Sequence, residues 1–375
     1  MSKKAIYLDY NATAPMRVEV IAAITESLSE IGNASSIHGY GRDVRRDIEK
    51  AREDVAQLVG TDPINVVFTS GATEANNAVI FGAPVSRILY SAIEHPSVIE
   101  AAAKHNNAHV IPVLPNGVID LDALETLLQA ENTPTLVSVM WVNNETGVIQ
   151  PIENIVTLAK EYNALFHCDA VQAAGRVKIE MDYLGIDYLT LSAHKIGGPS
   201  GIGALIYNHQ TILEKFIHGG GQERRRRAGT ENVIGAIGFG KAAECAAKEV
   251  GHLDKLQSWR DECENEMKRL VPQVEIIGED APRVPNTIQL ILPGVTAETQ
   301  LMALDLDGIA VSSGSACSSG SIKPSQVLLA MGVSEVRAKC AVRVSMGFAN
   351  TKEEVDSFLN QWVTNSQRLL CNISA

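Results

Sequence analysis

LSAHKIGGPSGIG, at residues 191–203, joins a run typical of a β-strand to a glycine-rich turn and carries Lys195 at the junction. Ser192 and His194 precede this lysine, and a glycine-rich turn begins at Gly197, after Ile196. An ordinary lysine prefers a solvated helix face. A lysine among small residues at the edge of a sheet is able to form an imine when its surroundings lower its pKa. The segment therefore indicates a sheet whose edge carries a reactive amine.

The sequence on either side of this segment predicts an α/β fold. Amphipathic helices are expected at 18–32 and 41–59, and another at 152–163. Short β-branched runs alternate with such helical patterns, and this alternation is typical of a mostly parallel sheet covered by helices on both faces. The expected strands are 66–69, 87–93, 109–113, 135–142, 165–170, 188–193 and 202–208.

The pattern changes after about residue 252. A charged helix is expected at 254–270 and shorter strands at 287–292 and 341–346, and Thr351 with Glu354 forms a capping box that begins a last helix. We therefore predict two domains. Residues 15–253 would form a large cofactor-binding domain, and residues 1–14 with 254–375 a smaller α+β domain.

Composition narrows the classes of function. The net charge of −12 argues against nucleic-acid binding, although four arginines at 224–227 form either an anion-binding cluster or a solvated charge run. No signal peptide or membrane helix is expected. The cysteines match neither a metal site nor a disulfide framework, which predicts a cytoplasmic protein with reduced thiols. They are Cys168, Cys245, Cys263, Cys317, Cys340 and Cys371.

Two more strand ends carry polar groups. FTSGATEANN (68–77) places Ala72 and Thr73 at the start of a helix, where backbone N–H groups suit a phosphate, although a plain capped helix has the same pattern. HCDAVQAAG (167–175) places Asp169 at the end of an apolar strand, either as the partner of a cationic group or as a helix N-cap.

An acid, a lysine and an anion cradle together suit pyridoxal phosphate (PLP). The lysine would hold its aldehyde, and the acid would keep its pyridine nitrogen protonated. GAIGFGKA (235–242) resembles a nucleotide-binding P-loop, but Ala242 replaces the magnesium-binding hydroxyl and the surroundings indicate a helix. PLP is therefore the expected cofactor.

The chain resembles the cysteine desulfurases, PLP enzymes of the class V aminotransferase group with fold type I. The resemblance runs through nearly the whole chain, and the motifs in this order are specific. The landmarks are LDYNATAP (8–15), GNASSIHGYGR (32–42), FTSGATEANN, IEHPSV (93–98), VNNETGVIQPI (142–152), HCDAVQAAG, SAHKIGGPSGIGAL (192–205), HGGGQERRRRAGTEN (218–232) and SSGSACSSGS (312–321).

The resemblance implies a role for each matching residue. Lys195 would hold the cofactor as an imine, Asp169 would pair with the pyridinium nitrogen, and Gln172 would bond the phenolic oxygen. His95 would stack on the ring as an acid/base group, and Arg343 with Asn144 would fix the substrate carboxylate beside the cofactor. The phosphate would be lined by Ala72, Thr73, Ser192, His194 and, from the other subunit of a homodimer, Thr230. Singly, each of these residues also has a structural explanation, such as a turn for Asn144.

The resemblance also implies that Cys317 is the nucleophile. Its serine- and glycine-rich segment, about 312–332, is similar to the long-loop enzymes of iron–sulfur cluster assembly and tRNA thiolation. Such a sulfurtransferase converts L-cysteine to L-alanine and an enzyme persulfide, then passes sulfur to an acceptor protein. A selenocysteine lyase, a small-substrate aminotransferase and a non-catalytic partner-binding relative remain alternatives. Arg225 occupies a position where the family usually has glycine, which puts the local backbone shape in doubt.

Overall fold

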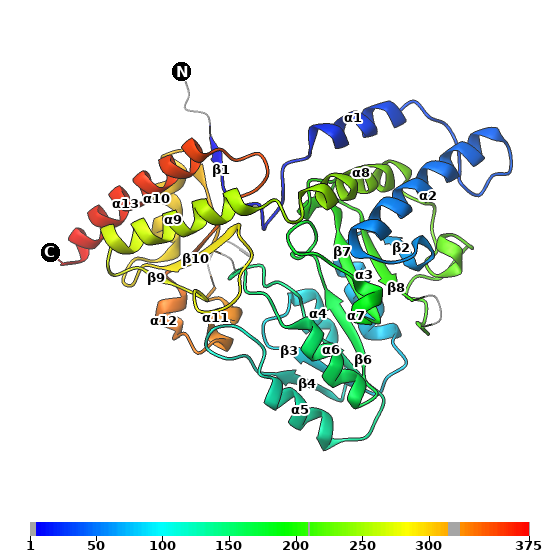
Figure 1. Ribbon diagram of the computed structural model, residues 1–375, viewed down its shortest axis with the longest axis horizontal. Coiled ribbons are helices and arrows are strands. Elements are labelled where there is room, and N and C mark those ends of the chain that lie inside the picture. The colour runs from blue at the N-terminus through cyan, green and yellow to red at the C-terminus, as the bar shows by residue number, and fades with distance from the viewer. Residues whose placement is uncertain (1–4, 209–210, 314–322, 375) are drawn as a thin grey trace.

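Figure 1 shows the computed structural model, which describes residues 5–208, 211–313 and 323–374. The strands are β1 (Ile6–Tyr7), β2 (Val66–Thr69), β3 (Arg87–Ser91), β4 (Ala108–Ile111), β5 (Thr135–Ser138), β6 (Leu165–Asp169), β7 (Tyr188–Ser192), β8 (Gly203–Tyr207), β9 (Glu275–Ile276), β10 (Thr287–Ile291), β11 (Ile309–Ala310) and β12 (Ala341–Ser345). The α-helices are α1 (Val18–Ser27), α2 (Gly39–Val59), α3 (Ala72–Gly82), α4 (Pro96–Ala102), α5 (Leu121–Ala130), α6 (Ile152–Glu161), α7 (Met181–Leu184), α8 (Val233–Glu249), α9 (Asp254–Leu270), α10 (Ala297–Leu306), α11 (Gln326–Ala330), α12 (Glu335–Ala338) and α13 (Lys352–Ser374).

A seven-stranded mixed sheet forms the centre of the larger part, in the order β2-β8-β7-β6-β5-β3-β4. β8 runs antiparallel to both of its neighbours, and the other strands pair in parallel. The α/β fold is therefore confirmed, and each expected strand is present. Several end earlier than predicted: β5, for example, stops at Ser138 because the backbone N–H of Met140 bonds the side chain of Glu94.

Helices α2 and α8 pack closely beside this sheet (Figure 1). Gly240 of α8 permits the contact, because a Cβ there would lie 2.5 Å from the Cα of Ala51 in α2. Residues 235–242 lie within α8 and form no strand–loop–helix, which confirms the expected helix and excludes a P-loop there. The first expected helix ends at Ser27 rather than at residue 32, and α2 begins two residues earlier than predicted.

The smaller part contains the antiparallel sheet β12-β10-β9, with α9 and α13 side by side (Figure 1). Leu8 from the start of the chain packs into the same apolar core as Trp362 of α13, and β1 pairs with β11. The capping box is present, since the N–H of Thr351 bonds Glu354 and the N–H of Glu354 bonds Thr351. These contacts support the proposed division into residues 15–253 and residues 1–14 with 254–375.

No helix in the described ranges is long and apolar enough to span a membrane.

Candidate active site

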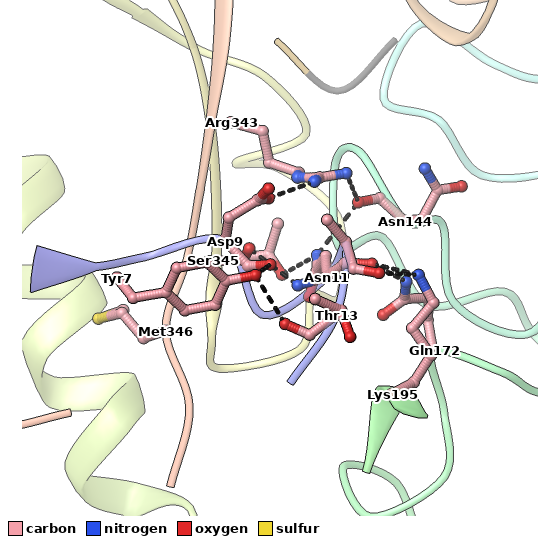
Figure 2. Close-up of polar contacts among 12 residues, drawn as sticks. Tyr7, Asp9, Asn11, Thr13, Asn144, Gln172, Lys195, Arg343, Ser345 and Met346 are labelled. Carbon is pink, nitrogen blue, oxygen red and sulfur yellow. Dashed lines mark hydrogen bonds and ion pairs between the residues drawn. The ribbon is translucent and has the colours of Figure 1, made fainter. Parts of the chain in front are cut away.

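Lys195 ends a short 3-10 helix, Ala193–Lys195, that follows β7. Its amine donates to the carbonyl oxygens of Asn11 at 2.6 Å and of Ala12 at 2.7 Å (Figure 2). Burial lowers the pKa of this amine to about 8, and the positive charges of Arg343 and Arg176 add to the effect. An amine with such a pKa is partly neutral near physiological pH and is therefore able to act as a nucleophile.

Asp169 ends β6, the strand next to β7, so its carboxylate lies at the same edge of the sheet as Lys195. The side chain is buried and accepts from the N–H of Val171 at 3.0 Å. The helix N-cap interpretation is wrong, because residues 171–176 form turns rather than a helix. A buried carboxylate at the open end of a strand suits a cationic partner.

Asn76, which sequence analysis did not single out, connects Asp169 to another predicted residue. This fully buried side chain donates to Oδ2 of Asp169 at 2.8 Å and to Oγ of Ser97 at 2.9 Å. Ser97 in turn contacts Nδ1 of His95 at 2.8 Å. The chain from Asp169 to His95 joins β6, α3 and α4, and no local sequence pattern reports contacts across 93 residues.

His95 caps α4, where its Nδ1 accepts from the backbone N–H of Ser97 at 3.1 Å. That bond places the proton of the neutral ring on Nε2. The ring lines an open hollow, yet desolvation lowers its pKa, and the charge of Lys195 lowers it further while that of Asp169 opposes. His95 is therefore a neutral imidazole that presents an N–H donor, and its helix-capping bond accounts for its orientation.

The N-terminus of α3 offers unblocked backbone donors. Its N-cap is Gly71, which has no side chain to accept from Ala72 or Thr73, and a Cβ on Gly71 would meet nothing within 4 Å. Gly203 supports the turn from behind, since a Cβ there would lie 2.7 Å from the backbone carbon of Gly71. The hollow beside α3, about 500 Å³, is lined by Thr73, Asn77, Phe81, His95, Pro96, Ser97, Glu100, Ala101 and Lys104.

The other residues predicted for the phosphate lie in different places. Ser192 is buried at the end of β7. His194 contacts Oγ1 of Thr13 at 3.2 Å, and burial with the charge of Lys195 lowers its pKa to about 4. Thr230 is exposed and is not among the residues that line the hollow at Thr73.

Arg343 and Asn144 lie close together, on the side of Asn11 that is opposite Lys195 (Figure 2). The buried guanidinium of Arg343 donates to the carbonyl oxygen of Asn144 at 3.0 Å and to the carboxylate of Asp9 at 2.6 Å. Its Nε has no hydrogen-bond partner among the described residues. Asp9 was not predicted for the site, because its contact with Arg343 joins positions 334 residues apart.

Cys317 lies outside the described residues. The chain on each side of it is fixed next to the Arg343 site. Ser312 pairs with Arg343 through backbone hydrogen bonds of 3.1 and 2.6 Å. Ser325 donates to the carboxylate of Glu145, the residue after Asn144, at 2.5 Å.

The arginine run at 224–227 serves structure at three of its four positions. Arg224 pairs with Glu49, Arg226 stacks on Tyr207, and Arg227 pairs with Glu74 in α3. Arg225 has a φ of 66°, so the position where the family usually has glycine is indeed left-handed. The solvated-run and anion-cluster interpretations are both too simple, because most of these guanidinium groups already have partners.

The residues present fit PLP by their chemistry. They supply an amine with a lowered pKa, a buried carboxylate at the adjoining strand end, and unblocked N–H groups at a helix start. The described residues contain no group of three or more His, Cys, Asp or Glu side chains placed to hold a metal ion.

Comparisons with known proteins agree with this chemistry. The sequence family "Aminotransferase class-V" matches residues 6–358. The chain is 41% identical to "Cysteine desulfurase IscS" of Dictyoglomus turgidum, over 96% of this chain and 93% of the relative. It is also 41% identical to a cysteine desulfurase of Sinorhizobium fredii, over 95% of each.

Two solved structures share the fold over most of the chain. The NifS-like protein from Rickettsia africae superposes with a TM-score of 0.90 at 35% identity, covering 97% of this chain and 99% of that one. A structure described as SspA in complex with cysteine has a TM-score of 0.78 at 30% identity, covering 91% and 98%.

Proposed function

The chain belongs to the class V aminotransferases and is a PLP-dependent cysteine desulfurase, and on that premise we propose that Cys317 receives the sulfur of L-cysteine as a persulfide. The Cys317 thiolate attacks the substrate sulfur. An S–S bond forms as the bond from sulfur to the substrate Cβ breaks, and its electron pair stays with the carbon. That carbon takes up a proton, and the product leaves as L-alanine.

The residues around Lys195 would hold the cofactor. When bound, PLP supplies an electron sink for carbanion chemistry at the substrate. Lys195 would bind it covalently, Asp169 would pair with its ring nitrogen, and Gln172 would donate to its phenolic oxygen. His95, with its proton on Nε2, would lie against the ring as an acid/base group. The phosphate would be bound by Ala72, Thr73, Ser192 and His194.

Arg343 would bind the substrate carboxylate, with Asn144 beside it and the cofactor. Its guanidinium is held from two sides by Asp9 and the Asn144 carbonyl, and this contact limits its rotation. A fixed guanidinium suits bidentate carboxylate binding. The SspA relative was solved with cysteine, which supports an amino-acid carboxylate as the ligand here.

The observation that carries the role of Cys317 is the position of the chain on each side of it. Ser312 is bonded to Arg343, and Cys317 follows five residues later in the sequence. Five residues of chain span at most about 18 Å. The described cysteines support the same choice, since burial raises the pKa of Cys168 and of Cys263, and a raised pKa disfavours the thiolate.

Sulfide release from L-cysteine tests this role. Cys317→Ser should keep the visible absorbance of bound PLP and lose sulfide release by at least about 100-fold, because a hydroxyl does not replace the thiolate. Cys371→Ser is the matched control, as Cys371 is exposed in the last helix. Unimpaired release from Cys317→Ser would overturn the proposal.

We further propose a homodimer in which Thr230 reaches the phosphate site of the other subunit. Its exposure, and its absence from the residues that line the hollow at Thr73 in its own chain, support this placement. Light scattering measures the oligomeric state.

Mixed dimers of Lys195→Ala and Thr230→Ala chains test shared sites. If the sites are shared, one site of each hybrid carries both substitutions and the other site carries neither. Recovered activity supports sharing, and its absence in proven hybrids contradicts it.

The sulfur acceptor would be an iron–sulfur scaffold or a tRNA-thiolation protein in the cytoplasm. The iron–sulfur role follows from the long-loop resemblance, and the five described cysteines are all free thiols, as in a reducing compartment. Turnover of cysteine against selenocysteine, with each candidate acceptor present or absent, distinguishes these roles. A several-fold rise in turnover with one acceptor identifies it.

A further inference from the structure

Arg176 lies one turn of chain after Gln172 and holds its side chain. The Nη1 of Arg176 donates to the backbone oxygen of Gln172 at 2.9 Å and also to the side-chain oxygen Oε1 of the same residue. An amide has one oxygen edge and one nitrogen edge, and only the oxygen accepts. The contact with Arg176 therefore fixes which way the Gln172 amide faces.

The nitrogen edge of Gln172 faces the predicted cofactor lysine. Its Nε2 donates to the carbonyl oxygen of Asn11 at 2.9 Å, and the amine of Lys195 donates to that same oxygen at 2.6 Å (Figure 2). Two donors on one acceptor lie close together. The second N–H of the Gln172 amide is not used by a described residue and remains for a ligand.

No carboxylate pairs with Arg176 in residues 5–208, 211–313 and 323–374. Its guanidinium is half-buried and, with Lys195, lines a small cavity of about 50 Å³. Burial and the charge of Arg343 lower its pKa to about 10, so it remains charged at physiological pH. A partly buried cation without a counter-ion costs stability, and such a cost is typical of a functional site.

We propose that Arg176 is a positioning residue that orients the Gln172 amide with its nitrogen toward Lys195 and the phenolic oxygen of PLP. The inference rests on the proposed function, because that function assigns the phenolic oxygen to Gln172. The unpaired charge of Arg176 also acts directly, since it favours the unprotonated form of the Lys195 amine. The charged and titratable groups around that amine are Arg343, Arg176, Asp169, Asp9, His95 and His194.

The first test uses the protein free of PLP, so it does not depend on cofactor binding. The pH dependence of Lys195 modification by cyanate, followed by peptide mass spectrometry, reports the protonation of this amine. In Arg176→Met the midpoint should move to higher pH by roughly half a unit or more, because one nearby positive charge is gone. Arg176→Lys keeps the positive charge, so its midpoint should lie close to that of the wild type.

The second test uses the PLP-loaded protein and follows its visible absorbance with pH. Arg176→Met should move the titration midpoint to higher pH, and the shift should be smaller in a Gln172→Met background, where no amide remains to be oriented. Arg269→Met, which removes a surface arginine paired with Glu266, is the control and should move neither midpoint.

The outcomes are distinct. Equal shifts from Arg176→Met with and without Gln172 would overturn the positioning role. A lower melting temperature with both midpoints unchanged would show that Arg176 is purely structural and would also overturn it. A wild-type protein that binds no PLP would instead refute the proposed function, and the cyanate titration would still report the charge effect.

Discussion

The amine of Lys195 lies 2.6 Å from the carbonyl oxygen of Asn11, a residue that belongs to the first segment of the chain. Asn11 is itself held by the small sheet, because its N–H bonds Oγ of Ser345 at 3.0 Å and its side chain bonds Oγ1 of Thr287 at 2.9 Å. The lysine after β7 is therefore bound through one residue to strands β10 and β12. The position of the smaller part thus affects the environment of the amine.

Lys195 should destabilise the cofactor-free protein at neutral pH. Its folded pKa is about 8, below the ordinary value, so between pH 8 and about 10.4 the unfolded state binds more protons and stability rises with pH. Below pH 8 the whole cost is present. Lys195→Met should therefore raise the free energy of unfolding at pH 7 by up to about 3 kcal/mol, with a gain that shrinks toward pH 10.

Urea denaturation of the PLP-free protein at several pH values measures this gain. Lys215→Met is the control, because Lys215 is exposed and its removal should change little. A gain that is the same at pH 7 and pH 10 would mean that packing by methionine, rather than release of a desolvated charge, causes the effect.

Asn76 should matter for cofactor retention although it is outside the predicted set. Asn76→Ala removes the donor shared by Asp169 and Ser97, leaving two buried acceptors without it. Loss of such bonds costs about 1–3 kcal/mol, so PLP affinity should fall roughly tenfold or more. Titration of PLP absorbance gives the dissociation constant. Asn107→Ala, at a half-buried residue whose amide bonds the exposed Glu131, should leave it unchanged, and an unchanged value for Asn76→Ala would exclude the bridging role.

The sequence was sufficient to predict the sheet and the polar residues at the ends of its strands. Asp169 ends one apolar run and Lys195 follows another, and the ends of neighbouring parallel strands meet at one edge, so their proximity follows from the pattern. Asn76, Asp9 and Arg176 do not follow from it. Their roles depend on contacts between distant segments or on the orientation of an amide. Neither of these produces a periodic pattern in the sequence.

The left-handed backbone of residues 223–225 is another feature that the sequence pattern does not predict. Glutamate and arginine rarely adopt a positive φ, so the sequence does not predict one here. Nevertheless Glu223, Arg224 and Arg225 have φ values of 42°, 54° and 66°. Only comparison with the family, where glycine is usual at residue 225, indicated an unusual shape. Tertiary contacts must therefore hold this conformation against its local cost.

Glu94 should make stability fall as pH rises. Burial, and then the charge of Asp169, raises the pKa of its carboxyl well above the usual range, and its Oε2 has no partner among the described residues. The folded state therefore keeps a proton that the unfolded state loses above its ordinary pKa near 4.3. Stability is full below that pH and falls, by at most about 1.4 kcal/mol per pH unit, until the folded carboxyl ionises.

Glu94→Gln removes this dependence, because the amide has nearly the shape of the neutral acid and carries no ionisable proton. Its melting temperature should exceed that of the wild type by a margin that increases as the pH rises above about 5, until the folded carboxyl ionises. Glu131→Gln, at an exposed carboxylate, is the control. A difference between Glu94→Gln and the wild type that does not increase above pH 5 would contradict a buried neutral acid.

The buried ion pair of Arg52 and Glu223 should hold the segment that leads to Thr230. The two side chains are 3% and 4% exposed and share bonds of 2.7 and 3.1 Å, and Glu223 also accepts from the N–H of Phe68. Glu223→Gln leaves the buried Arg52 charge with only the half-exposed Glu49, whose carboxylate lies 3.4 Å from Nε. Loss of one partner from a buried ion pair typically costs about 3–5 kcal/mol. The melting temperature should fall sharply, and PLP binding should weaken if the segment completes the phosphate site of another subunit.

A matched pair of variants separates the charge from the backbone. Replacing both members, Arg52→Met with Glu223→Gln, removes the buried charge that has lost Glu223 and should recover part of the loss. Arg225→Gly, which suits the φ of 66°, should be neutral or raise stability by up to about 1 kcal/mol. If Glu223→Gln has the same melting temperature as the wild type, the ion pair contributes nothing to this conformation. If Arg225→Gly is strongly destabilised, the left-handed turn is not adopted in solution.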